Sequence, residues 1–406
     1  MDLAVIASAP SLQDSFRLRR AGEFANPRRA AATLPVVYGD LSQGETGVWP
    51  AVCVDTLHHV YALAGCPLAG PEQGQRVRVF AAEGGELFGF SYDPALALEG
   101  KGPIAAVTFA ADQRANEPLG VLALGRAGTN GLMVNPVEIV RDFLVNRAGG
   151  PAAALDGAAW ARASSQAAQR GYEAAGVIAQ DQALGQVLSE VLAACLGSWW
   201  LDAGGRLCLG LEGGRPLVSE DQVAFAFAPD PDLDSRVEAD LKNLCNRISA
   251  DYAYNWAEDF YEAHADGEDL RDPLSEAIHG RQERAFAWPW VRQAATARRL
   301  QADLVERFAR PRRLISLTSA DLAGLHLSKG DFAWYSSAWQ LDARRQPLTN
   351  RLVQVLALEP DLDARRLRCT LLDTGFHRTL AEIADGAYLA DGACTAGAAL
   401  DPVPAE

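Results

Sequence analysis

The sequence predicts an α+β protein that is mainly β, in which two antiparallel β-barrel-like lobes flank a small helix-plus-hairpin insert. On both sides of the insert, short runs of alternating apolar residues are separated by Gly, Asp and Pro turns, which is typical of antiparallel sheets. In the insert, apolar residues repeat at helical spacing and lead into a Trp pair and a Gly-rich turn, which indicates a helix packed on a hairpin. The expected domains are an N-terminal arm (1–33), a first β lobe (34–134), the α+β insert (135–215), a second β lobe with one helix near 294–310 (216–375) and a loose C-terminal tail (376–406).

Composition narrows the possible partners of the chain. The net charge is −15, and a DNA-binding protein needs a basic face to neutralise phosphates, so sequence-specific nucleic-acid binding is not expected. Plain solubility explains this charge, and an acidic lumen along which DNA slides is the alternative. No run of about 18 or more apolar residues is present, so we expect no transmembrane segment. An Asp replaces the basic leader in MDLAVIASAP, which argues against a secretory signal.

The cysteines predict buried thiols in a protein made in a reducing cytoplasm. Their number is odd, none forms a CxxC pair, and most lie in apolar or strand-like runs. A zinc or iron–sulfur site is the less favoured alternative, because the ligand spacing is absent. The seven are Cys53, Cys66, Cys195, Cys208, Cys245, Cys369 and Cys394.

The arm and the first lobe come first in the chain. Arg side chains among Ala and Ser in 1–33 indicate either an arm that reaches a neighbouring subunit or a frayed terminus. The run RVRVFAAEGGELFGFSY predicts a hairpin with its turn at Gly84 and Gly85, and with Phe88, Phe90 and Tyr92 sharing one face of the returning strand.

The insert opens with NPVEIVRDFLVN, in which Pro136 stands at the first helical position. A second helix is expected at about 181–197, with Asp181 as its N-cap and Gly197 as its stop. Trp199 and Trp200 then begin a strand that turns at 202–205 and returns over 206–211. Because successive strand residues face opposite ways, one Trp is expected in the core and the other against a partner.

In the last half of the chain, apolar residues again alternate with polar ones, as in strands. Residues 235–257 read as strand, and a switch in the parity of the apolar positions near 243–246 indicates a bulge or bend. The acidic run 258–272 is expected to be a solvated loop. A helix near 294–310 precedes several further strands.

No residue set predicts an active site, so no catalytic, cofactor-binding or metal-binding residue is assigned and no enzyme activity is expected. Ser91 in GFSYD lacks the second Gly and the helix of a nucleophile elbow, which favours an ordinary strand residue. His58 and His59 are adjacent in a strand-like run and would face opposite ways, which disfavours a shared metal.

Two groups of residues keep alternatives open. Glu258, Asp259 and Glu262 could supply the paired carboxylates of a glycosidase, since such pairs are set by space and not by spacing. Aromatic residues in the last third favour core or subunit interface over base stacking, because no basic groove accompanies them. They are Trp288, Trp290, Trp334, Tyr335 and Trp339.

The order of these motifs resembles the tail-tip or baseplate hub proteins of long-tailed bacteriophages and of gene transfer agents, over about residues 34–375. The segments that carry this likeness are YGDLSQGETGVWPAVCVDT, NPVEIVRDFLVN, VLSEVLAACLGSWWLDAGGRLCLGL, NRISADYAYNW and PRRLISLTSADLAGLHLSKGDFAWYSS, followed by a strand pair that ends LLDTG.

The resemblance implies a structural virion protein. Such a hub forms a homotrimer at the tail tip, joins the sixfold tube to a central fibre or spike, and closes the DNA channel until infection. Its partners are the distal tail or tube, tape-measure and central-fibre proteins, and it is made in the host bacterial cytoplasm. Long members of the family continue into fibre-binding domains, so for this short form we expect another subunit to recognise the receptor. The alternatives are a tail-associated cell-wall glycosidase and a carbohydrate-binding module.

Overall fold

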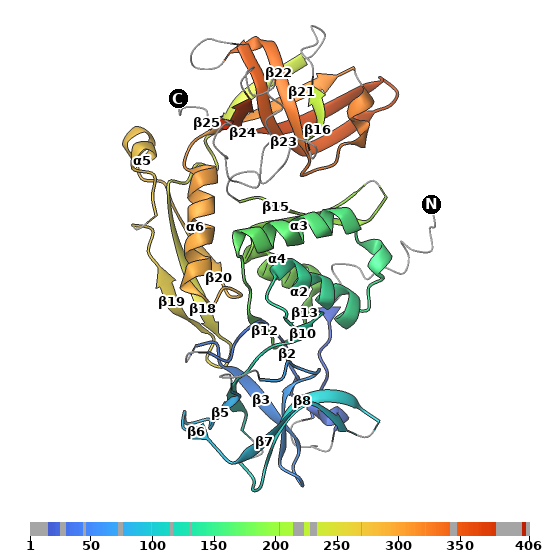
Figure 1. Ribbon diagram of the computed structural model, residues 1–406, viewed down its shortest axis with the longest axis vertical. Coiled ribbons are helices and arrows are strands. Elements are labelled where there is room, and N and C mark those ends of the chain that lie inside the picture. The colour runs from blue at the N-terminus through green and yellow to red at the C-terminus, as the bar shows by residue number, and fades with distance from the viewer. Residues whose placement is uncertain are drawn as a thin grey trace. The chain divides into compact units, whose positions relative to one another are not determined.

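The computed structural model describes most of the chain and confirms the α+β, mainly β class (Figure 1). The described residues are 15–24, 30–43, 46–71, 76–98, 100–113, 117–129, 131–202, 204–213, 223–227, 234–268, 270–320, 322–341, 347–378 and 400–402. None of the helices in these ranges is both long and apolar enough to cross a membrane.

The chain divides into two compact units. The first unit contains Met1–Glu212, Ser249–Asp266 and Ala285–Leu300, and the second contains Gly213–Ile248, Gly267–Arg284 and Gln301–Glu406. This division differs from the expected domains, because the insert and two later segments join the first lobe. One reason is Trp290, which is 1% exposed, packs against the backbone of Gly176 and lies 6.3 Å from the ring of Tyr38.

The first unit is built on an antiparallel sheet with the strand order β6-β5-β9-β3-β4-β8-β7. Its inner strands β3, β4 and β8 are apolar almost throughout, because both of their faces are covered. The expected hairpin forms between β5 and β6, but the return strand ends at Leu87, and Phe88 is exposed. The strands are β3 Trp49–Asp55, β4 Val60–Ala64, β5 Arg78–Phe80, β6 Glu86–Leu87, β7 Phe90–Leu98, β8 Gly102–Phe109 and β9 Leu119–Leu122.

Short antiparallel ribbons connect this sheet to the rest of the unit. The described part of the N-terminal arm is packed on the chain and not frayed: Ser15 and Phe16 pair with the insert, and Leu18 and Ala21 are buried. The remaining ribbon strands are β2 Val36–Tyr38 with β12 Gly176–Ile178, β10 Ala127–Gly128 with β11 Gly131–Leu132, and β1 Ser15–Phe16 with β13 Gln182–Ala183; a 3-10 turn covers Ala21–Glu23.

The insert contains the two expected helices and one that the sequence reading missed. Helix α2 (Pro136–Asp142) begins as expected, with the Asn135 side chain accepting a hydrogen bond from the Val137 amide, and continues as a π-helical turn over Phe143–Arg147. Helix α3 (Gly157–Arg170) lies between the two expected helices, where no helix was predicted. Its Trp160 indole donates to the Leu207 carbonyl at 2.8 Å. Helix α4 (Leu184–Ala193) is followed by the hairpin of β14 (Gly197–Leu201) and β15 (Leu207–Leu211), and a 3-10 turn covers Ala152–Ala154.

Helix α4 is shorter than expected at both ends. Its N-cap is Ala183 and not Asp181, because Gln182 and Ala183 pair with β1. The Asp181 carboxylate instead accepts hydrogen bonds from the Leu18 amide and the Arg20 side chain. Gly197 begins strand β14 and does not stop the helix.

Residues 247–308 form a three-stranded sheet and a helix. The sheet has the order β19-β18-β20, with β18 at Arg247–Asn255, β19 at Phe260–Ala265 and β20 at Glu283–Trp288. Strand β19 lies where a loop was expected, so that expectation was wrong for Phe260–Ala265. Helix α6 (Ala294–Phe308) confirms the helix expected near 294–310, and the Gln301 amide donates to the Ile248 carbonyl at 2.8 Å. A further short helix, α5, covers Pro273–His279.

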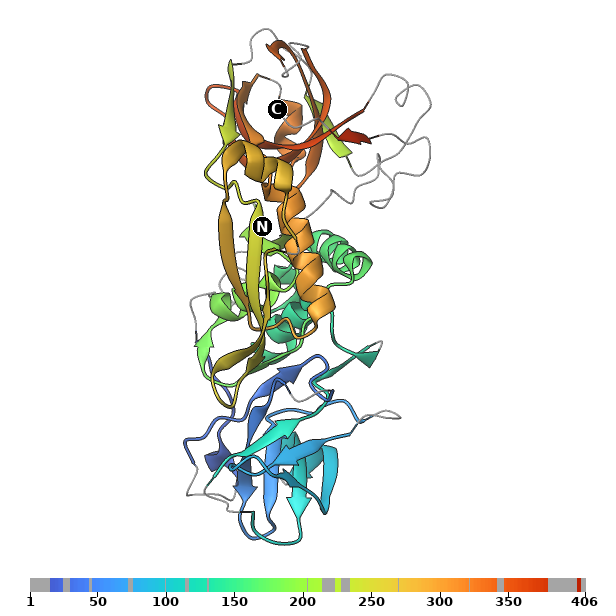
Figure 2. The ribbon, with the colours of Figure 1, turned by 90° about the vertical axis from the view of Figure 1, so that its left-hand side faces the viewer.

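The second unit is built on a curved seven-stranded sheet (Figure 2). Its order is β16-β22-β23-β24-β21-β17, and β25 pairs with β24. One pair departs from the expected antiparallel pattern, since β16 runs parallel to β22. The bounds are β16 Val223–Phe227, β17 Asp234–Asp240, β21 Arg312–Ser319, β22 Phe332–Leu341, β23 Pro347–Asp361, β24 Arg366–Arg378 and β25 Leu400–Pro402, with a 3-10 turn at Leu322–His326.

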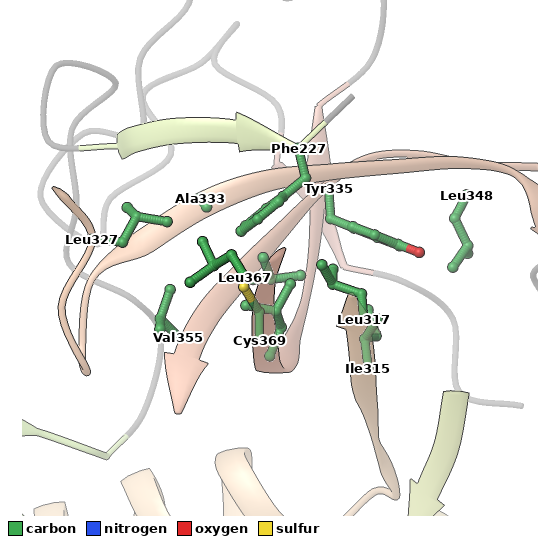
Figure 3. Close-up of a cluster of buried hydrophobic side chains, with 12 residues drawn as sticks. Phe227, Ile315, Leu317, Leu327, Ala333, Tyr335, Leu348, Val355, Leu367 and Cys369 are labelled. Atoms are coloured by element: carbon green, nitrogen blue, oxygen red, sulfur yellow. The ribbon is translucent and has the colours of Figure 1, made fainter. Parts of the chain in front are cut away.

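An apolar cluster forms the core of the second unit (Figure 3). Phe227, Ile315 and Tyr335 are each 5% exposed or less, and alternate residues of β21 to β24 complete the cluster. The Gln340 amide donates to the Ser235 hydroxyl at 2.7 Å, which links β22 to β17. Whether either sheet closes into a barrel stays a prediction. Apart from β25 and the end of β24, the expected C-terminal tail lies outside the described residues.

Strands β17 and β18 explain the switch of parity near 243–246. They belong to different sheets, so the expected bend is a complete change of sheet. Leu241 and Asn243 lie in the connection, where the Asn243 amides donate to the Asp240 carboxylate.

Candidate functional site

A cleft in the first unit is the best candidate for a binding site. Its volume is about 770 Å³, within the range of ~300–1,000 Å³ that is usual for ligand sites. Four segments distant in sequence line it: the start of β3, the β5–β6 hairpin, the start of β9 and the β18–β19 turn.

The local sequence explains how these segments meet. The β18–β19 turn is tied to the sheet by the Ala257 amide, which donates to the Val48 carbonyl at 3.0 Å. The Asn255 side chain accepts from the amides of Ala257 and Glu258 and so holds the turn. Gly120 allows close packing, because a Cβ at this position would lie 2.9 Å from a methyl of Val48.

The charged groups of the cleft differ in how they are paired. Arg78 donates to Glu86 at 3.1 Å, and Arg76 lies 3.4 Å from the same carboxylate. The hydrogen bond from Arg78 lowers the pKa of Glu86, so this group stays ionised at neutral pH. Glu83 and Glu258 are exposed on the two turns that face the cleft.

Glu262 differs from Glu258, because it is half-buried and one of its two carboxylate oxygens is hydrogen-bonded. Its Oε1 accepts from the Asn255 amide at 2.7 Å, whereas its Oε2 is buried and has no hydrogen-bond partner among the described residues. The nearby Arg292 interacts with Glu262 only through space, and its Nη2 donates to the Gln43 carbonyl.

The structure brings together two of the three carboxylates named for a glycosidase. Glu258 and Glu262 both line the cleft, whereas Asp259 does not. The Asp259 carboxylate accepts from the Tyr254 hydroxyl, and the pKa of this tyrosine is raised to about 12, mainly by burial and then by Asp259. A cleft lined by two carboxylates can bind a cation, or it can support acid–base chemistry on a substrate that lies between them.

The remaining candidates lie elsewhere. Ser91 is an exposed residue of strand β7, as expected. His58 and His59 lie on the turn between β3 and β4 and not on a strand, and the His58 ring nitrogen lies 2.7 Å from the Asp55 carboxylate.

The six described cysteines are buried thiols that form no disulfide with one another, as expected. Burial raises the pKa of Cys195 to about 12 and the pKa of Cys208 to about 11. Cys394 lies outside the described residues.

A cluster of possible metal ligands that the sequence reading missed is already held by an arginine. Asp156, Asp202 and Cys208 offer ligand atoms within 4.8 Å of one another. The Arg206 guanidinium lies 2.8 Å from Asp156 and 2.7 Å from Asp202. The arginine therefore supplies the positive charge that the two carboxylates need.

The aromatic residues divide into core and surface groups. Trp288, Trp290 and Tyr335 are buried, whereas Trp339 is 77% exposed. Trp199 and Trp200 are both half-buried, so their expected division into one core and one exposed residue was wrong.

No protein-family model matches the chain, and no curated protein matches it significantly.

Proposed function

We propose that the chain is a structural subunit of a bacteriophage or gene-transfer-agent tail tip, where it forms part of the hub between the tail tube and a central fibre or spike. The observation that carries this proposal is the order of parts along the chain. A β-rich segment, a helical insert that ends in a hairpin, a second β segment, a helix and a final sheet follow one another in the order that the hub resemblance implies.

The chemistry of the described residues supports an assembly role. Arginine side chains form ion pairs with three of the chain's carboxylates, those of Glu86, Asp156 and Asp202. Large apolar side chains are exposed at the end of β22, where Trp339 is 77% and Leu341 is 52% exposed. Exposed aromatic and aliphatic residues of this kind are typical of subunit interfaces.

The hub role includes a threefold ring, contacts to tube, tape-measure and fibre proteins, and closure of the channel. Measurement of the molar mass in solution by light scattering tests the ring, with the chain alone and with its tube protein. We expect a trimer, alone or on addition of the tube protein. A chain that remains monomeric under both conditions contradicts the ring.

A cell-wall glycosidase is the second candidate, because Glu258 and Glu262 line one cleft. Lysis of purified peptidoglycan by the wild-type chain, lost in Glu258→Gln and Glu262→Gln but kept in Glu359→Gln, would replace the structural role with an enzymatic one. Glu359 is an exposed residue of β23 in the second unit and serves as the matched control. The hub proposal predicts no lysis by any of the four proteins.

A further inference from the structure

We draw no further inference here: the strongest candidate, the apolar surface patch of Trp339 and Leu341 at the end of strand β22, is an unpartnered face, and nothing in the structure shows what covers it.

Discussion

At the scale of single residues, Asp142 is the most heavily used polar group of the first unit. It is buried, and it accepts hydrogen bonds from Tyr38 at 2.7 Å, from Arg126 at 2.9 Å and from Asn146 at 2.9 Å. Burial alone would raise the pKa of Asp142, but the bonds from Asn146, Tyr38 and Arg126 outweigh it and lower the pKa. The network joins α2 to the strands that precede it.

Substitution Asp142→Asn removes one partner of this buried ion pair. We expect a loss of ~3–5 kcal/mol in the free energy of unfolding at pH 7, because Arg126 is then left without its counter-charge. Urea denaturation measures this loss. Glu138→Gln is the control, since Glu138 is an exposed acid on the same helix.

The same variant gives a pH dependence with a definite sign. The lowered pKa of Asp142 means that its contribution is present above the pKa of the unfolded state, about 3.9, and is lost as the pH falls through the folded value. The difference in unfolding free energy between wild type and Asp142→Asn should therefore shrink on acidification below about pH 4. A difference that is constant from pH 7 to pH 3 contradicts this assignment.

Because the cysteine thiols are buried, we expect them to react slowly with thiol reagents. Burial raises the pKa of Cys53 to about 11 and the pKa of Cys369 to about 12, so few thiolates form at pH 8. In a Cys394→Ser variant, an aromatic disulfide reagent should label the folded chain slowly and label six thiols after unfolding in guanidinium. Rapid labelling of the folded chain would contradict the buried positions.

At the scale of elements, α4 is the helix whose apolar face matters most to the insert. Val187, Leu188, Val191 and Leu192 are each at most 1% exposed, as the helical spacing predicted. The helix was expected to continue to about residue 197, but it ends at Ala193. Leu196 therefore lies beyond the helix, takes a φ of 52° and is half-buried.

Val191→Asp should prevent folding of the first unit. A carboxylate without a partner in this core costs several kcal/mol, against a stability of ~5–15 kcal/mol for a whole domain. Expression of soluble protein and circular dichroism measure the effect. Gln186→Asp is the matched control, because Gln186 is exposed on the same helix, and it should change stability by about 0.5 kcal/mol at most.

The elements that the sequence predicted well are those with strong periodicity. Helices α2, α4 and α6 have long apolar stripes, and α2 also has a Pro at its start. Helix α3 was missed because its stripe is mainly Ala, although Asp156 caps it and Gly171 ends it with a φ of 62°. Strand β19 was missed because its acidic flanks resemble a loop, whereas pairing of Tyr254 with Tyr261 across the hairpin holds it in the sheet.

The cleft could be predicted only in part. The sequence named Glu258 and Glu262 as possible partners, since an acidic run can supply paired carboxylates. The sequence could not indicate Arg78, Glu86 or Gly120 as residues of the same cleft. They line it together with Glu262 only because β5 pairs with β9 and because the β18–β19 turn is hydrogen-bonded to Val48.

At the scale of the whole molecule, the proposed hub role rests on the order of the elements along the chain and not on a catalytic group. Two sheets of seven strands each carry their own core, and the insert belongs to the first unit. An assembly protein needs such stable bodies with exposed edges and apolar contacts at their surfaces. Trp339 is the most exposed of the large apolar side chains in the second sheet, and it is the first position at which to look for a subunit contact.

Substitution of this tryptophan separates folding from assembly. Trp339→Ser should leave the thermal melt of the chain nearly unchanged, because the side chain is 77% exposed. It should weaken trimer formation or attachment to the tube protein in sedimentation experiments, since large aromatic residues dominate interface energies. Wild-type assembly by folded Trp339→Ser would remove Trp339 from the interface.

The most direct test of the proposed hub role is to locate the chain in assembled particles. Particles produced by the genome that encodes the chain are labelled with a gold-conjugated antibody against it and viewed by negative-stain electron microscopy. The proposed hub role predicts label at the distal end of the tail, beside the central fibre or spike. Label that is absent from the tail tip, or confined to the capsid, contradicts it.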